Sequence, residues 1–269
     1  MAASAGVTER GERWNHNIHY HRLILAAVPP RCQRVLDVGC GEGMLARQLA
    51  HLATHVVGID RDAPSIDLAR RQDPGGTIDF ICGDFLTYPL APAAFTMITS
   101  VAALHHMDAR VALRRMDQLL APGGTLAIVG LARSRLPADL LWEAAAVAAN
   151  LGYRLTRTCW EQPSPTMWPP PHTYTDIRAL ARHALPGVCY RRHLLWRYSL
   201  VWVKPAPLTP PDPGEGAAKS PDTGGLRRTV LYRAIRSQRP CWATPRTCQR
   251  PASRVTRNCM AGLGRSMQA

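Results

Sequence analysis

Short apolar runs alternate with amphipathic stretches through the first half of the chain. An unbroken apolar run is typical of a buried strand, and apolar residues that recur every three or four positions are typical of a helix. Strands are predicted at 35–38, 54–59, 77–81, 95–100 and 125–131, with helices between them, as over 111–120. This alternation predicts a parallel sheet with right-handed crossovers.

Two further strands are predicted near residue 200, at 188–194 and 198–203. Residues 195–197 are too few for a parallel crossover, so this pair is predicted to form an antiparallel hairpin. The pattern as a whole predicts an α/β fold. It is a Rossmann-like, seven-stranded, mostly parallel sheet with an antiparallel C-terminal hairpin edge and helices on both faces.

Other helices are predicted outside this alternation. Residues 8–28 are compatible with an amphipathic helix that Pro29 and Pro30 end. The long segment 132–187 is predicted to contain helices at about 137–151 and about 176–185, the second with Thr175 as its N-cap.

The first strand runs into the glycine-rich turn Asp37-Val38-Gly39-Cys40-Gly41-Glu42-Gly43. Glycine permits positive φ and close approach of a ligand, and the free N–H groups of the next helix face that ligand. Such a turn suits a cofactor that contains adenosine. Its spacing is not the G-x-G-x-x-G of a dinucleotide site, and the carboxylate of Glu42 disfavours a bound diphosphate.

Further segments at matching spacings extend this motif over roughly residues 10–205. With them, the sequence resembles the class I S-adenosylmethionine-dependent methyltransferases, in the small-molecule branch with a type 11 or type 12 domain. The resemblance implies an enzyme that uses S-adenosyl-L-methionine and methylates oxygen, nitrogen or carbon of a small molecule by direct displacement. The matching segments are Val56-Val57-Gly58-Ile59-Asp60, Phe80-Ile81-Cys82-Gly83-Asp84-Phe85, Phe95-Thr96-Met97-Ile98-Thr99-Ser100, Leu104-His105-His106 and Leu119-Leu120-Ala121-Pro122-Gly123-Gly124.

Asp60 is expected to bind the ribose of the cofactor. It stands seventeen residues after Gly43 at the carboxyl end of the second strand, where a carboxylate accepts both ribose hydroxyls. The alternative is an N-cap for the helix that begins near Ala63, which Asp62 serves equally well.

By resemblance, Asp84 hydrogen-bonds the adenine amino group and Phe85 lies against the ring, with an Asp-led turn and a core phenylalanine as the alternatives. Ser100 ends the strand that should lie beside the first, across the switch point, so Ser100, Val101 and Ala102 are expected to line the methionine end. The expected cofactor-binding residues are Asp37, Gly39, Cys40, Gly41, Gly43, Asp60, Arg61, Asp84, Phe85 and Ser100.

His105 and His106 are the candidate catalytic residues, because they follow this strand and either one is able to take a proton from an attacking hydroxyl or amine. The alternative is a packing role at a helix start. His16, His19 and His21 allow a metal interpretation, but no Cys or carboxylate cluster completes a site, so no metal is expected.

The segment 132–187 is longer than one crossover helix requires, and long loops are usually functional or disordered. Trp160, Met167 and Trp168 favour a lid over the methyl-acceptor pocket, with a plain hydrophobic plug as the alternative. Trp14, His16 and Tyr20 of the N-terminal helix are further candidates to reach the active site.

The net charge of +14 is unevenly distributed. From residue 206 onward there are eleven Lys or Arg against three Asp or Glu, a net charge of +8, in a segment rich in Pro and Gly. Residues 1–205 are therefore predicted to be the methyltransferase domain, and 206–269 a basic, disordered tail. An RNA- or acidic-lipid-binding arm is the alternative for this tail.

Composition and motifs leave other functions to weigh. A nucleic-acid methyltransferase that uses the basic tail and a non-catalytic cofactor-binding module are the alternatives, and an NAD-dependent oxidoreductase is disfavoured by the glycine spacing. No apolar run approaches the length of a bilayer span and the N-terminus has no signal-peptide pattern. We expect a cytoplasmic protein with free thiols, a small-molecule partner, and neither a membrane nor a nucleic-acid partner.

Overall fold

The structure is a computed structural model that describes residues 13–160 and 167–206. The first part of the predicted N-terminal helix and the predicted tail from residue 207 onward therefore lie outside the described residues. Within the described part of the chain, no helix has the length and apolar character needed to cross a membrane.

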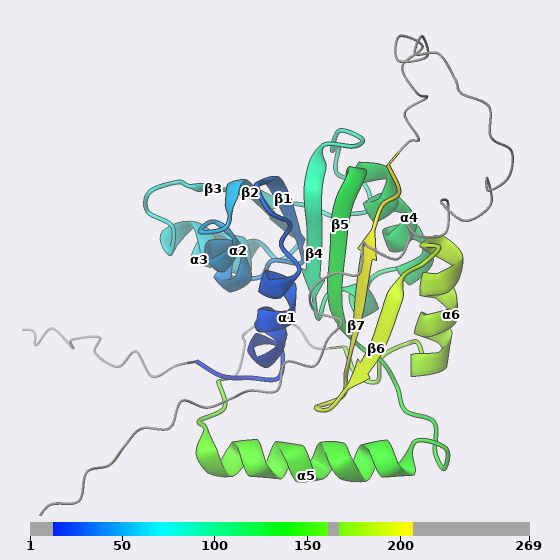
Figure 1. Cartoon of the computed structure of the whole chain (residues 1–269). Coiled ribbons are helices and arrows are strands. Elements are labelled where there is room, and N and C mark those ends of the chain that lie inside the picture. The colour runs from blue at the N-terminus through cyan, green and yellow to red at the C-terminus, as the bar shows by residue number, and fades with distance from the viewer. Residues whose placement is uncertain (1–12, 161–166, 207–269) are drawn as a thin grey trace, which may run out of the picture. The chain divides into compact units, whose positions relative to one another are not determined.

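The described residues contain a single seven-stranded sheet, which confirms the predicted fold class (Figure 1). Its strand order is β3-β2-β1-β4-β5-β7-β6, parallel from β3 to β5, with β7 antiparallel to both β5 and β6. The strands are β1 (Cys32–Val38), β2 (Ala53–Asp60), β3 (Ile78–Cys82), β4 (Phe95–Val101), β5 (Leu120–Leu131), β6 (Cys189–His193) and β7 (Arg197–Val203).

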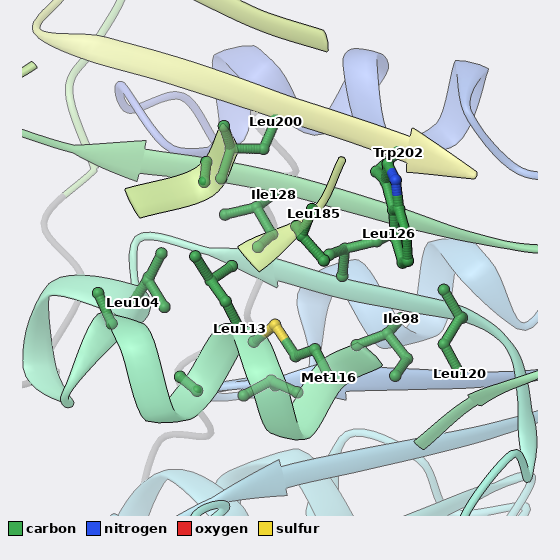
Figure 2. Packing of buried hydrophobic residues seen from close by; sticks show 14 of the residues in the cluster. Ile98, Leu104, Leu113, Met116, Leu120, Leu126, Ile128, Leu185, Leu200 and Trp202 are labelled. Atoms are coloured by element: carbon green, nitrogen blue, oxygen red, sulfur yellow. The ribbon is translucent and has the colours of Figure 1, made fainter. Parts of the chain in front are cut away.

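Helices cover both faces because side chains of each strand alternate between two apolar cores. One core joins the sheet to α4 (Ala109–Leu119) and α6 (Tyr174–Ala184), and its packing of Ile98, Leu126 and Ile128 against Leu113 and Met116 is seen in Figure 2. The other core joins the opposite face to the helices α1 (His21–Ala26), α2 (Met44–Leu49) and α3 (Ala63–Arg71).

Within residues 13–28, the described part of the predicted helix 8–28, the helical segment is shorter than predicted. In this part only a 3-10 turn, Ile18–Tyr20, and α1 are helical, and Trp14 instead forms a bridge to Cys159. The cause is Asn15, whose side-chain oxygen accepts the backbone N–H groups of residues 17 and 18 at 2.9 and 2.8 Å and starts the turn. This local competition for backbone N–H groups is typical of asparagine.

Both helices of the 132–187 segment are displaced from their predicted bounds. The first, α5, spans Leu140–Thr156, and the prediction that Thr175 is the N-cap of the second is wrong. Thr173 caps α6 instead, in a capping box with Asp176. The box needs an acidic residue three positions after the cap, and only Thr173 has one at that spacing.

The carboxyl ends of the parallel strands meet at one edge of the sheet, which positions the site. Because β7 runs in the opposite direction, its first residue, Arg197, pairs with Leu131 at the end of β5 and lies at the same edge. The helix α5 lies along this edge (Figure 1), where Oδ1 of Asn150 accepts a hydrogen bond from Nε2 of His16 at 2.9 Å.

Candidate active site

A cavity of about 920 Å³ opens at the carboxyl edge of the sheet. The ends of β1, β2, β3, β4, β5 and β7 all contribute to its wall, together with the N-terminal segment and the 132–187 segment. Of the residues expected from sequence to bind the cofactor, this cavity is lined by Gly39, Gly41, Asp60, Arg61, Asp84 and Phe85.

The glycine turn has the conformation that its sequence predicts. Gly39, Gly41 and Gly43 have φ of 72, 53 and 75°, in the left-handed region that favours glycine. A Cβ on Gly39 would lie 2.2 Å from Cβ of Ala103. A Cβ on Gly43 would meet the ring of Phe80 at 2.5 Å, so Gly43 serves helix packing and does not line the cavity.

Asp60 connects this turn to the end of β2. Its Oδ2 accepts the backbone N–H of Gly41 and its Oδ1 accepts that of Asp62, both at 2.9 Å. Asp62, in turn, is the N-cap of α3 and accepts the N–H of Ser65 at 3.1 Å. The capping role is therefore taken by Asp62, and the carboxylate of Asp60 borders the cavity with lone pairs to spare.

Asp37 lies below the turn and is 1% exposed. Its Oδ1 accepts the hydroxyl of Thr99 at 2.9 Å, whereas Oδ2 has no hydrogen-bond partner among the described residues. Burial, helped by the negative charge of Asp60 and opposed by the hydrogen bond from Thr99, raises the pKa of this carboxyl to about 7. Asp37 lines a small pocket of about 40 Å³ together with Gly39, Cys40 and Asn17.

Two other expected cofactor residues lie beneath the surface of the main cavity. The thiol of Cys40 is buried and donates to the carbonyl of Gly41 at 3.7 Å, and burial raises its pKa. Ser100 is fully buried and its hydroxyl donates to the carbonyl of Val38 at 3.0 Å. The structure thus places Ser100 behind the wall, and the next residue, Val101, faces the cavity instead.

Asp84 and Phe85 lie at the β3 end of the cavity. Asp84 is exposed and accepts the N–H of Leu86 at 2.8 Å, in the Asx turn that was the alternative interpretation of this residue. Phe85 both lines the cavity and belongs to the core, where Arg115 lies 5.6 Å from its ring. Both interpretations of these residues are compatible with this placement.

The two histidines after β4 both line the cavity, with ring centroids 4.1 Å apart. His105 is 8% exposed and its Nδ1 has no hydrogen-bond partner within the described part of the chain. Burial, together with the positive charges of His106 and Arg197, lowers the pKa of His105 to about 4. Burial also lowers the pKa of His106, on which Arg61 and Asp60 act in opposite directions.

The 132–187 segment contributes aromatic and sulfur-containing side chains to the cavity wall: Trp160, Met167 and Trp168, with Cys159 beside them. The backbone N–H of Trp160 donates to the carbonyl of Trp14 at 2.8 Å, which ties the segment to the N-terminal residues. Residues 161–166, which complete this segment, lie outside the described part of the chain.

Polar cavity residues that were missed from the sequence include Asn15, Asn17 and Arg197. Of the N-terminal candidates, His16 lines the cavity, but Trp14 and Tyr20 are buried outside its lining. Arg197 had a usable signal, since it is a charged residue between the aromatic residues Trp196 and Tyr198 in a largely apolar segment. The asparagines had none, because their position depends on the turn that replaces the predicted helix.

The residues of this edge fit an adenosylated amino-acid cofactor. A turn with glycine at alternate positions gives the backbone room to approach such a molecule. A buried carboxylate oxygen without a partner among the described residues and a second carboxylate at the cavity supply acceptors for it. Over residues 13–160 and 167–206, no group of three or more His, Cys, Asp or Glu is arranged to hold a metal ion.

Fold and cavity define an α/β protein that binds its ligand at the switch point of a mostly parallel sheet. A family model described as "Methyltransferase domain" matches residues 36–128. The Mycobacterium tuberculosis protein named uncharacterized methyltransferase Rv0089 is 41% identical over 193 residues, which are 71% of this chain and 98% of that protein. The chain therefore belongs to this methyltransferase family.

More distant similarities agree with this assignment. The O-methyltransferase rstn1 of Aspergillus nomiae is 37% identical over 107 residues, covering 38% of this chain and 48% of that protein. A structure of Haemonchus contortus phosphoethanolamine N-methyltransferase 2 was solved with phosphomonomethylethanolamine and S-adenosylhomocysteine. It superposes on this chain with a TM-score of 0.50 at 16% identity, and the match covers 70% of this chain and 53% of that one. The cyclase SpnF has the same TM-score at 19% identity, covering 69% and 82%. These two structures show the shared fold alone.

Proposed function

We propose that this protein transfers the methyl group of S-adenosyl-L-methionine to a small-molecule acceptor. The observation that carries the proposal is the hydrogen bond between the glycine turn and Asp60 at the edge of a large cavity. This cavity continues toward β5 and β7. One part of this cavity suits the cofactor, and the remainder leaves room for an acceptor beside it. Family membership supports methyl transfer as the reaction.

When bound, the cofactor supplies an electrophilic methyl group on a positively charged sulfur, so the protein contributes mainly alignment and exclusion of water. Asp60 and the backbone of Gly41 would hold the ribose, and Asp84 with Phe85 the adenine. Asp37, Gly39 and Cys40 border the small pocket assigned to the methionine portion. We further propose 1–205 as the catalytic domain and 132–187 as its lid.

His105 and His106 remain the candidates for holding or moving a proton at the acceptor. A pKa of about 4 keeps His105 neutral at neutral pH, so its unpartnered Nδ1 is available as a weak acceptor of a hydrogen bond. Such a weak base is poorly matched to an alcohol and better matched to an acceptor that has already lost its proton. The relative named an O-methyltransferase supports oxygen as the atom methylated.

The first test is calorimetric titration of the full chain with S-adenosylhomocysteine, beside NADH. We expect micromolar binding of the first, corresponding to about −8 kcal/mol, and none of the second. Binding of NADH alone would overturn the proposal. Turnover of labelled S-adenosylmethionine with a panel of small acceptors then separates an enzyme from a binding module, and an RNA substrate in the same panel tests the alternative that rests on the tail.

A further inference from the structure

Arg197 is a buried positive charge at the acceptor end of the cavity. It is the first residue of β7, it is 6% exposed, and it lines the cavity. Burial lowers its pKa to about 10, so the guanidinium stays charged at neutral pH. Its hydrogen-bond partners within the described residues are all neutral oxygen atoms, and it forms no ion pair with a described carboxylate.

The bonds of Arg197 leave donors for a ligand. Nε and Nη2 both donate to Oδ1 of Asn17, at 3.2 and 2.7 Å, and Nη1 donates to the carbonyls of Leu195 and Trp196 at 3.1 and 3.3 Å. A guanidinium has five N–H groups, so one N–H on Nη2 remains. Because a guanidinium only donates, Asn17 must turn its oxygen toward Arg197, which leaves the amide N–H groups of this cavity residue to other acceptors.

The carboxylates in the described lining of the cavity lie at one end. They are those of Asp60, Asp62 and Asp84, at or after the ends of β2 and β3. Arg197 lies at the start of β7, and the lining also contains His105, which follows β4, is more than nine-tenths buried and has an Nδ1 without a partner among the described residues. A buried guanidinium is costly unless an anion compensates it, and here no described residue supplies one.

We propose that Arg197 and Asn17 form an oxyanion subsite for the methyl acceptor, so that the acceptor carries a carboxylate or phosphate group. This inference rests on the proposed function and deepens it. The side chains of Met167 and Trp168 line the same cavity and suit an apolar body attached to the anionic group. The remaining N–H of Arg197 and the amide N–H groups of Asn17 supply the donors, and the positive charge of the guanidinium favours either oxyanion.

The carboxylate of the cofactor is the competing anion. Arg197 lies on β7, three strands away from the glycine turn that follows β1 in the order β1-β4-β5-β7. Adjacent strands are about 4.8 Å apart, so β1 and β7 are separated by roughly 14 Å across the sheet. Asn17 borders both the large cavity and the small pocket assigned to the methionine portion, whereas Arg197 lines the large cavity alone. We therefore assign Arg197 to the acceptor, and the titrations with S-adenosylhomocysteine below separate the two anions.

The test uses hexanoate and hexyl phosphate as anionic probes and hexanamide as a neutral match, titrated by ligand-detected NMR into the full chain with and without saturating S-adenosylhomocysteine. We expect at least one anion to bind about tenfold or more tightly than the amide. Arg197→Met should abolish this preference, and Arg197→Lys should retain part of it. Arg182→Met, which removes an exposed arginine on α6, is the matched control and should leave the preference intact.

Equal binding of all three probes to the wild-type protein, or a preference that survives in Arg197→Met, would overturn the subsite. Loss of S-adenosylhomocysteine binding in Arg197→Met with unchanged hexanoate binding would assign Arg197 to the cofactor instead. If the variants do not fold, hexanoate should still shift the Nε resonance of Arg197 in the wild-type protein, and an unmoved resonance would contradict the proposal. If the wild-type chain binds hexanoate more tightly than hexanamide but does not bind S-adenosylhomocysteine, the proposed function is contradicted and the anion site is still supported.

Discussion

Asp60 Oδ2 accepts the backbone N–H of Gly41 at 2.9 Å, so the end of β2 holds the glycine turn that follows β1. The same carboxylate also accepts the N–H of Asp62, where α3 is about to begin. One side chain therefore fixes two of the loops that border the cavity. Binding and stability are linked at this position because the group that would contact the ribose also shapes the turn.

Replacing Asp60 by Ala should weaken S-adenosylhomocysteine binding tenfold or more and lower the free energy of unfolding by about 1–2 kcal/mol. Both effects follow from the loss of its two backbone hydrogen bonds beside the cavity. Calorimetry measures the affinity and urea unfolding measures the stability.

Asp108→Ala is the matched control for this variant. Asp108 is an N-cap that accepts the N–H groups of Arg110 and Val111, and it does not line the cavity. We expect a similar loss of stability with unchanged S-adenosylhomocysteine affinity. If the two variants behave alike in both measurements, Asp60 has only a structural role.

Gly39→Ala should destabilise the domain by more than the backbone strain of an alanine at positive φ alone would cause. The new Cβ would lie 2.2 Å from Cβ of Ala103, in addition to the strain of φ at 72°. Gly76→Ala isolates that strain, because Gly76 has φ of 60° and nothing lies within 4 Å of its Cβ position. We expect about 1 kcal/mol for Gly76→Ala and about 2–4 kcal/mol for Gly39→Ala by urea unfolding.

The double variant Gly39→Ala/Ala103→Gly separates the two contributions at Gly39. Removing the methyl group of Ala103 relieves the collision but leaves the backbone strain, so part of the lost stability should return. If Gly39→Ala proves no more destabilising than Gly76→Ala, the turn moves freely away from Ala103 and its close packing is not a constraint.

The hydrophobic pattern was sufficient to predict the fold, because the spacing of apolar residues within each strand and crossover helix indicates the type of that element. The seven strands and the antiparallel edge follow from apolar runs and from one short connection, residues 195–197. The errors fall where polar side chains compete for backbone N–H groups, at Asn15 and at the capping box of Thr173. Periodicity does not record such competition, so the bounds of these helices shift.

The glycine-turn end of the cavity was largely predictable and the β7 end was not. Local motifs place Gly39, Gly41 and Asp60 at the ends of adjacent strands, so sequence order alone brings them together. Arg197 and Asn17 are 180 residues apart and meet only through the long-range packing of β7 and the N-terminal turn. No spacing rule connects such residues.

Stability should fall in mild acid because of His105. Its pKa is lowered from the ordinary 6.5 to about 4 by burial, so between these values the unfolded chain binds a proton that the folded protein does not. The contribution is fully present above pH 6.5 and is lost as the pH falls toward 4, at about 1.4 kcal/mol per pH unit and about 3 kcal/mol in total by pH 4.

The measurement is urea unfolding of the wild-type protein and His105→Gln across pH 4 to 7, since their difference removes the contributions of other groups. The variant should lose less stability in acid than the wild-type protein. His183→Gln, which removes an exposed histidine on α6, serves as the control and should follow the wild-type curve. Parallel curves for the wild-type protein and His105→Gln would contradict the lowered pKa of His105.

Cofactor affinity should depend on pH through Asp37. In the free protein, burial raises the pKa of this carboxyl to about 7, and its Oδ2 has no partner. The amino group of S-adenosylhomocysteine is positively charged and favours the ionised carboxylate. Affinity should therefore rise as the pH increases from 6 to 8, by up to about tenfold, which corresponds to a shift of one pKa unit in Asp37 on binding.

Calorimetry at several pH values measures this dependence. The variant Asp37→Asn should bind S-adenosylhomocysteine more weakly, and its affinity should not rise with pH. Asp60→Ala, which leaves Asp37 in place, should keep the rise at lower affinity. A pH-independent affinity in the wild-type protein would show that Asp37 keeps its protonation state when the ligand binds.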